Sequence, residues 1–159
     1  MAEDFARAAV RFCSVIEQAG AVPLQRWLRD AESALANAYA SAVALPAVGP
    51  ATMKPLPRMS HDEWAALYDE LRAALGAHDS YAVVLGEGDR ESIVAASLAD
   101  DLAEIYQELR SGLDASTSGA PPEDVLFEWR TAFEIHWASH AVGALGALRR
   151  VMQQLDDAS

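Results

Sequence analysis

The sequence is poor in basic residues, and lysine occurs only once, at Lys54. Twelve basic residues stand against 24 acidic ones, which gives a formal charge of -12. A field of that sign repels phosphate backbones and anionic membrane surfaces, so we expect neither nucleic acid nor a membrane as a partner. Cys13 is the single cysteine, which excludes an internal disulfide and favours a reducing compartment.

Long apolar runs are also absent, because no stretch of about 18 apolar residues occurs. The first residues are acidic, where a secretory signal would be basic. These absences predict a cytoplasmic protein without a membrane span.

Valine, isoleucine and threonine are sparse, whereas alanine occurs 33 times in 159 residues. Alanine is the best helix former, and β-branched residues dominate large sheets. Apolar residues recur at helical spacing in five stretches. We therefore predict an all-α fold: residues 1–159 form one domain, an up-and-down antiparallel bundle of about five helices. The helices are expected at residues 3–19, 23–45, 60–75, 91–112 and 122–155.

Three connections separate the later helices. Residues 46–59 hold four prolines and are predicted to be a surface loop. Residues 77–90 are predicted to be irregular, with Tyr81–Leu85 as a short extended segment, and residues 113–121 to form a flexible loop. Gly143 and Gly146 weaken the last helix, which indicates a bend or close packing there.

Familiar catalytic motifs are incomplete. The stretch after Leu85 contains Gly86 and Gly88, but Glu91 stands where a dinucleotide fingerprint needs its third glycine. A zinc protease needs a glutamate directly after the first histidine of its motif, and Trp137 occupies that position. Di-iron bundles use Glu-x-x-His pairs, and the chain has none.

The most informative segment is Phe133-Glu-Ile-His-Trp-Ala-Ser-His140. His136 and His140 are four residues apart, so they project from one helix face, as a two-histidine metal site requires. Arg130 and Glu134 have the same spacing and are predicted to face inward with the histidines. Four inward ionisable groups are costly unless they are paired.

The predicted partner is Asp101, at the edge of the apolar arc of the helix before. It is expected either to pair with Arg130 or to bond with His136 or His140. Asp100 lies opposite that arc and is predicted to be solvated, whereas Glu108 lies close to Asp101 on the helical projection.

Two interpretations of this cluster remain open. Asp101, Arg130, Glu134, His136 and His140 form either a polar network that holds two helices in register or a functional site. In the functional reading, His136, His140 and Asp101 bind a single divalent transition metal and leave one position open. Acid–base chemistry without a metal is a further reading, although Ser139, the one nearby hydroxyl, is predicted to project away from the core.

Two segments resemble a family of small bacterial, all-helical proteins catalogued only as a domain of unknown function. They are Ser97-Leu-Ala-Asp-Asp-Leu-Ala-Glu-Ile-Tyr106 and Trp129-Arg-Thr-Ala-Phe-Glu-Ile-His-Trp-Ala-Ser-His140, with Ala138 where the family has glycine. The resemblance implies a helical bacterial protein and supplies no activity or cofactor. The characteristic positions it implies are Asp100, Asp101, Tyr106, Trp129, Arg130, Glu134, His136, Trp137 and His140.

The sequence thus favours a non-catalytic interaction or structural module without a cofactor, with an unidentified protein as its partner. The alternative is a metal-binding protein, with hydrolysis as the reaction considered. The sequence leaves open whether the chain is an enzyme and what its oligomeric state is.

Overall fold

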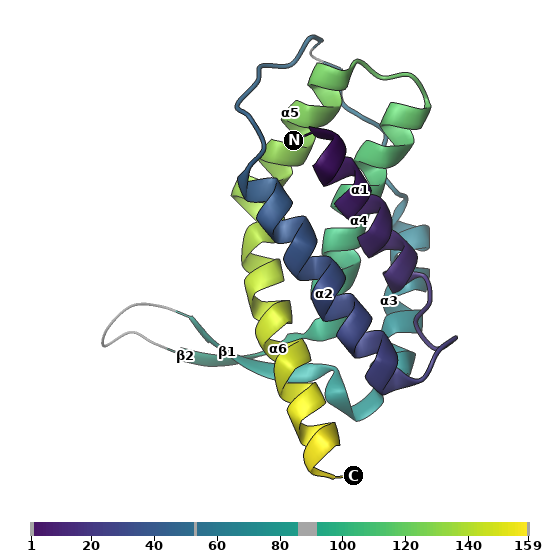
Figure 1. Cartoon of the computed structure of the whole chain (residues 1–159), viewed down its shortest axis with the longest axis vertical. Helices are drawn as coiled ribbons and strands as arrows, with labels where there is room; N and C mark the ends of the chain where they lie inside the picture. The colour runs from purple at the N-terminus through teal and green to yellow at the C-terminus, as the bar shows by residue number, and fades with distance from the viewer. Residues whose placement is uncertain (1, 53, 86–91, 159) are drawn as a thin grey trace.

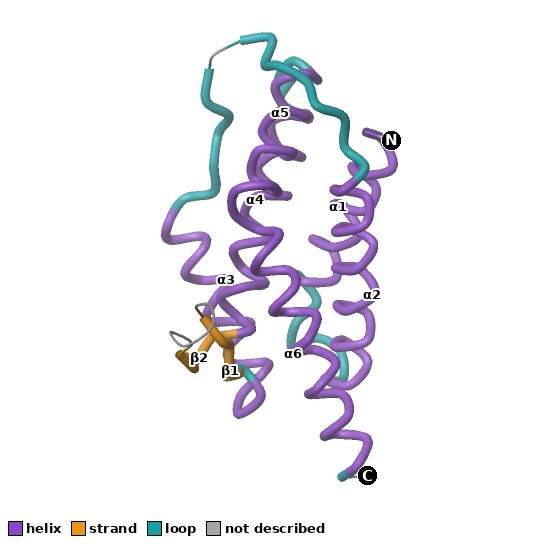
Figure 2. Tube along the Cα trace, turned by 90° about the vertical axis from the view of Figure 1, so that its left-hand side faces the viewer, coloured by secondary structure: helices purple, strands orange, loops and turns teal. Residues whose placement is uncertain are grey.

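The computed structural model describes residues 2–52, 54–85 and 92–158 and has the predicted all-α architecture. Its helices run as antiparallel neighbours (Figures 1 and 2). No helix of the described part is long and apolar enough to cross a bilayer. The helices are α1 (Ala2–Ile16), α2 (Leu24–Val43), α3 (His61–Leu75), the short 3-10 helix η1 (Gly76–His78), α4 (Leu98–Thr117), α5 (Pro122–Ala132), the π-helical segment η3 (Phe133–Trp137) and α6 (Ala138–Asp157). Helix α4 contacts α1, α3, α5 and α6, and α2 contacts both α1 and α6.

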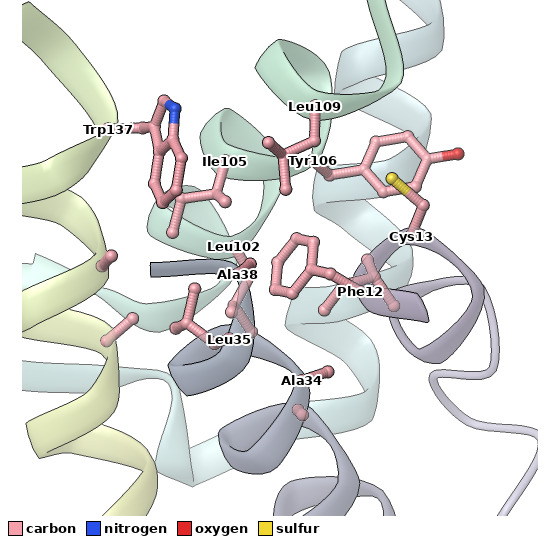
Figure 3. Packing of buried hydrophobic residues seen from close by; sticks show 14 of the residues in the cluster. Phe12, Cys13, Ala34, Leu35, Ala38, Leu102, Ile105, Tyr106, Leu109 and Trp137 are labelled. Carbon is pink, nitrogen blue, oxygen red and sulfur yellow. The ribbon is translucent and has the colours of Figure 1, made fainter. Parts of the chain in front are cut away.

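The apolar stripes of these helices meet in one core, where α1, α2, α4 and the last helix converge (Figure 3). The stripe predicted for the first helix is confirmed, because Phe5, Ala9 and Phe12 are fully buried. Burying a large apolar side chain contributes about 1.5–3 kcal/mol, so such residues dominate the stability of the bundle. The largest fully buried side chains are Trp27, Trp137, Phe5, Phe12, Ile16, Leu28, Leu35, Leu71, Leu75, Leu98, Leu102 and Ile105.

The third helix begins as its sequence predicts. The Ser60 hydroxyl accepts a hydrogen bond from the backbone N–H of Glu63, whose side chain bonds back to the Ser60 N–H. Gly76 follows the last residue with a φ of 55°, in the left-handed region that glycine tolerates best. Both ends of α3 are therefore fixed by local chemistry.

The fourth helix is displaced from its predicted range. It begins at Leu98 rather than near residue 91, because residues before it form a strand and Ser97 caps its first turn by accepting a hydrogen bond from Asp100 N–H. It ends at Thr117 rather than at Gly112, so most of the loop predicted at 113–121 is helical. Gly112 lies inside α4, at a close contact with α5: a Cβ there would lie 2.0 Å from Trp129 Nε1.

A two-stranded hairpin replaces the irregular segment and the first turns of the predicted fourth helix. Strands β1 (Ser80–Leu85) and β2 (Ser92–Ser97) are antiparallel, with Val83 opposite Val94 and Val84 opposite Ile93. The predicted extended segment at Tyr81–Leu85 is confirmed. Figure 1 shows the strands projecting sideways from the bundle past α6. Residues 86–91, which include the two glycines of the rejected fingerprint, lie outside the described residues.

The last helix runs from Pro122 to Asp157, and its irregularity lies at η3, before Gly143 and Gly146, where a bend or close packing was predicted. In η3 the Ala138 N–H donates to the carbonyl of Phe133, an i to i+5 bond. Each such turn holds about one residue more than an α turn. Residues on η3 are therefore rotated away from the positions that 100° per residue predicts.

The proline-rich connection lies on the surface, and Thr52 attaches its first part to the bundle. Asp124 at the start of α5 is buried, and its carboxylate accepts hydrogen bonds from the N–H and hydroxyl of Thr52 at 2.8 and 2.6 Å. These two bonds lower the pKa of Asp124. The loop is thus tied to α5.

Candidate functional site

A polar strip runs between α4 and the last helix. We define it as Asp101, Glu104 and Glu108 of α4 together with His136 and His140 of the last helix. The three acidic residues follow one another at spacings of three and four, so they form one line along α4. The two histidines are one turn apart and their ring centroids are separated by 5.0 Å.

Asp101 lies at one end of this strip and is 6% exposed. One of its oxygens lies 2.7 Å from Nδ1 of His140. The other accepts a hydrogen bond from the hydroxyl of Tyr81 in β1. Both carboxylate oxygens are therefore used within the fold, and the hydrogen bond with Asp101 raises the pKa of His140.

Glu108 repeats the arrangement at the other end, and it is 7% exposed. Its Oε1 lies 3.1 Å from Nδ1 of His136, and its Oε2 accepts a hydrogen bond from Arg58 at 3.2 Å. Arg58 comes from the proline-rich loop and also bonds to Glu128 at 3.0 Å. The buried charge of Glu108 thus has two partners.

Glu104 lies between these pairs. Its Oε2 is 3.9 Å from Nε2 of His136, too far for a hydrogen bond. Burial raises the pKa values of Glu104 and Asp100, the latter also because the charge of Asp101 is adjacent. Asp100, in the first turn of α4, is half-buried rather than solvated as predicted.

The structure does not bring Arg130 and Glu134 into the strip. Arg130 Nη2 lies 2.7 Å from the Glu134 carboxylate, and the Arg130 guanidinium also donates to the carbonyl of Leu45. Glu134 is exposed, so the prediction that it faces inward is wrong. It lies on η3, where the wider turn rotates side chains out of the α-helical projection. Among the three partners predicted for Asp101, which were Arg130, His136 and His140, the structure shows His140.

Tyr81 and Gly143 belong to the site although sequence reasoning did not assign them to it. A Cβ at Gly143 would lie 2.4 Å from the Tyr81 hydroxyl. The close packing predicted near Gly143 is therefore present, whereas Gly146 has only an Arg150 nitrogen at 3.9 Å. The sequence signal was the mid-helix glycine itself, but its partner was hidden in a strand from elsewhere in the chain.

The chemistry available to the strip is that of two oriented imidazoles. A carboxylate bonded to Nδ1 fixes the ring and leaves Nε2 for proton exchange or metal binding. Ser139 is exposed and donates to the backbone carbonyl of His136 at 2.9 Å, so it does not act beside the ring nitrogens. In the described part of the chain, no three histidine, cysteine or acidic side chains are grouped, as placed, to hold a metal ion.

Two open hollows flank the strip. One of about 360 Å³ lies beside His136 and Glu108, lined also by Arg58 and Ile135. The other, of about 420 Å³, lies beside Glu104 and includes His61 and Trp64. The strip is thus reached from solvent on the side where α3 and the proline-rich loop approach α4.

The fold has a solved counterpart. The crystal structure of protein BF1032 from Bacteroides fragilis matches with a TM-score of 0.81 and 20% sequence identity, over 93% of this chain and 89% of that chain. At that identity the similarity shows the fold alone. No curated protein matches the chain. Residues 1–154 match the model of the family described as Domain of unknown function (DUF5063). The chain therefore belongs to the DUF5063 family.

Proposed function

We propose that this protein is a non-catalytic interaction module that assembles with a second copy of itself through the β1–β2 hairpin. The observation that carries the proposal is the hairpin's exposure. In the described part of the chain the sheet has two strands only, so each keeps one edge without a paired strand. Such edges offer backbone N–H and C=O groups to another strand.

The strands lack the devices that protect an edge. Residues 80–85 and 92–97 contain no charged residue and no proline, the residues that usually block edge-to-edge pairing. They also expose apolar side chains, with Ile93 76% exposed, Val84 57% and Val94 37%. A two-stranded hairpin alone in water is marginally stable, so a further strand would stabilise it.

Charge favours the hairpin as the place where two copies meet. Each chain carries a formal charge of -12, so most of its surface repels its own copy. The uncharged strands project away from that surface (Figure 1). Antiparallel pairing of the same edge from two copies would form an isologous interface, which needs only one self-complementary element.

The base of the hairpin is anchored to the bundle through Tyr81. The Tyr81 hydroxyl donates to buried Asp101, and the Tyr81 ring lies under Arg150, whose guanidinium carbon is 5.6 Å from the ring centroid. In this proposal the Asp101–His140 pair is structural: it holds α4, the last helix and the hairpin in register.

Sedimentation velocity over a range of protein concentrations tests this proposal. We expect the wild type to be a dimer and Ile93→Lys to be a monomer, because lysine places charge at the proposed contact. Val10→Lys is the matched control, since Val10 is an apolar residue of α1 that is 51% exposed. A monomeric wild type at millimolar concentration would refute the proposal, as would an Ile93→Lys variant that remains dimeric.

A further inference from the structure

The two histidines of the polar strip are held in the same way. Each Nδ1 is bonded to a buried carboxylate of α4, His140 to Asp101 and His136 to Glu108. Neither Nε2 makes a hydrogen bond to any residue that the structure describes. Metal-ligating histidines have this environment, because a carboxylate on one ring nitrogen fixes the ring and raises the basicity of the other. Nε2 is therefore the atom each ring has left to offer.

Glu104 is the acidic residue positioned to complete a site. Its carboxylate lies 3.9 Å from Nε2 of His136. Two ligand atoms of a tetrahedral zinc ion with bonds of about 2.1 Å lie roughly 3.4 Å apart. A shift of about half an ångström would bring this one pair to that separation, and rotation about the glutamate side-chain bonds can supply it. The full site therefore forms only when the side chains move on binding, because no three such side chains of the described residues are grouped to hold an ion as they stand.

The charges around this point favour a cation. Asp101, Glu104 and Glu108 form one line along α4, with Asp100 adjacent to Asp101, and the residues facing them are two imidazoles and the Arg58 guanidinium. The carboxylates outnumber the groups that can neutralise them. A divalent ion between the histidines would reduce this excess of negative charge.

We propose that His136 Nε2, His140 Nε2 and the carboxylate of Glu104 bind one divalent transition metal ion of the zinc class. Asp101 is then an orienting residue and not a ligand, because its oxygens are occupied by His140 and Tyr81. Glu108 orients His136 in the same way. Three protein ligands leave a fourth tetrahedral position for water or another small molecule.

Isothermal titration of chelator-treated full-length protein with zinc chloride tests this site, beside nitrogen-detected NMR of the histidine rings. We expect one zinc ion per chain, with the Nε2 signals of His136 and His140 shifting on binding. Glu104→Gln should weaken binding more than tenfold, since it removes a charged ligand and leaves both carboxylate–imidazole pairs intact. Glu134→Gln is the matched control, an exposed glutamate already paired with Arg130, and should bind as the wild type does.

Several outcomes would overturn the site. Failure of the wild type to bind zinc overturns it directly, and the polar strip then only holds the helices in register. Zinc binding that survives in His136→Gln/His140→Gln places the ion elsewhere, as would unshifted Nε2 signals. Binding unchanged in Glu104→Gln overturns the ligand set. Circular dichroism of each variant separates loss of a ligand from loss of the fold.

Discussion

The apolar core and the polar strip lie on two faces of the same helix. Toward the core, α4 buries Leu102, Ile105 and Leu109 completely. Toward the last helix it presents Asp101 and Glu108, each within hydrogen-bond distance of one histidine. Apolar burial is non-directional and tolerates small shifts, whereas a carboxylate–imidazole bond requires its atoms within a few tenths of an ångström. The core therefore supplies most of the stability, and the strip fixes the register.

Removing an aromatic side chain from the core should give the largest effect. Trp137 is fully buried, with the Phe133 ring centroid 4.8 Å away and that of Phe5 6.5 Å away. We expect Trp137→Ala to lower the free energy of unfolding by about 3–5 kcal/mol, because the cavity cannot collapse fully. Urea denaturation measures this. Val142→Ala, at a side chain that is 60% exposed, is the control and should change stability by less than about 0.5 kcal/mol.

Breaking the strip should cost less than opening the core. Asp101→Asn keeps the shape of the side chain, but its amide nitrogen cannot accept from either Tyr81 or His140. We expect a loss of about 1–3 kcal/mol in the free energy of unfolding, since one of two partly buried donors loses its acceptor. Glu134→Gln should cost under about 0.5 kcal/mol, because its ion pair with Arg130 is exposed. Equal losses for the two variants would show that the strip adds no more than a surface ion pair.

The difference between the apolar core and the polar strip also determines what the sequence could predict. Helical periodicity predicted which residues form the core, because apolar residues at every third or fourth position of a helix face the same side. It failed for residues 92–97, which read as helix through their alanines but form a strand with Tyr81–Leu85. The signal was present in Ile93 and Val94, since β-branched residues after a glycine-containing stretch favour a hairpin.

The candidate site was predictable only in part, for a geometric reason. His140 and Asp101 were found by projection because both lie on regular α-helix. Glu134 was misplaced, because no residue in the sequence announces the i to i+5 turn at Phe133–Trp137. Tyr81 was missed because its contact with Asp101 depends on how the hairpin docks, which local patterns do not encode.

The contact between Tyr81 and Gly143 gives a test of how tightly the hairpin base is held. Alanine favours a helix interior over glycine by about 0.5–1 kcal/mol. Gly143→Ala should nevertheless destabilise the wild type by about 1 kcal/mol, because its methyl group displaces the Tyr81 hydroxyl from buried Asp101. In a Tyr81→Phe background the same substitution should cost little or stabilise the protein. A double-mutant cycle by thermal unfolding measures the difference, and additive effects would contradict the contact.

The smallest expected effect is the pH dependence of the Asp101–His140 bond. Asp101 raises the pKa of His140 above its ordinary value of 6.5. The folded state therefore binds the proton more tightly than the unfolded chain, and the resulting stability is complete below pH 6.5 and lost as the pH rises through the folded pKa. The raised pKa values of Asp100 and Glu104 act in the same direction but at lower pH, since both groups start from carboxyl values.

The comparison with His140→Gln isolates this contribution. In chelator-treated protein, the wild type should exceed the variant in stability by more at pH 6 than at pH 8.5. The side chain of His140 is 28% exposed, so the change across that range should stay below about 1 kcal/mol. Urea unfolding at several pH values measures it. A stability difference that grows with pH would contradict this prediction. It would mean that the imidazole ring of His140 is neutral in the folded protein and donates its single Nδ1 proton to Asp101.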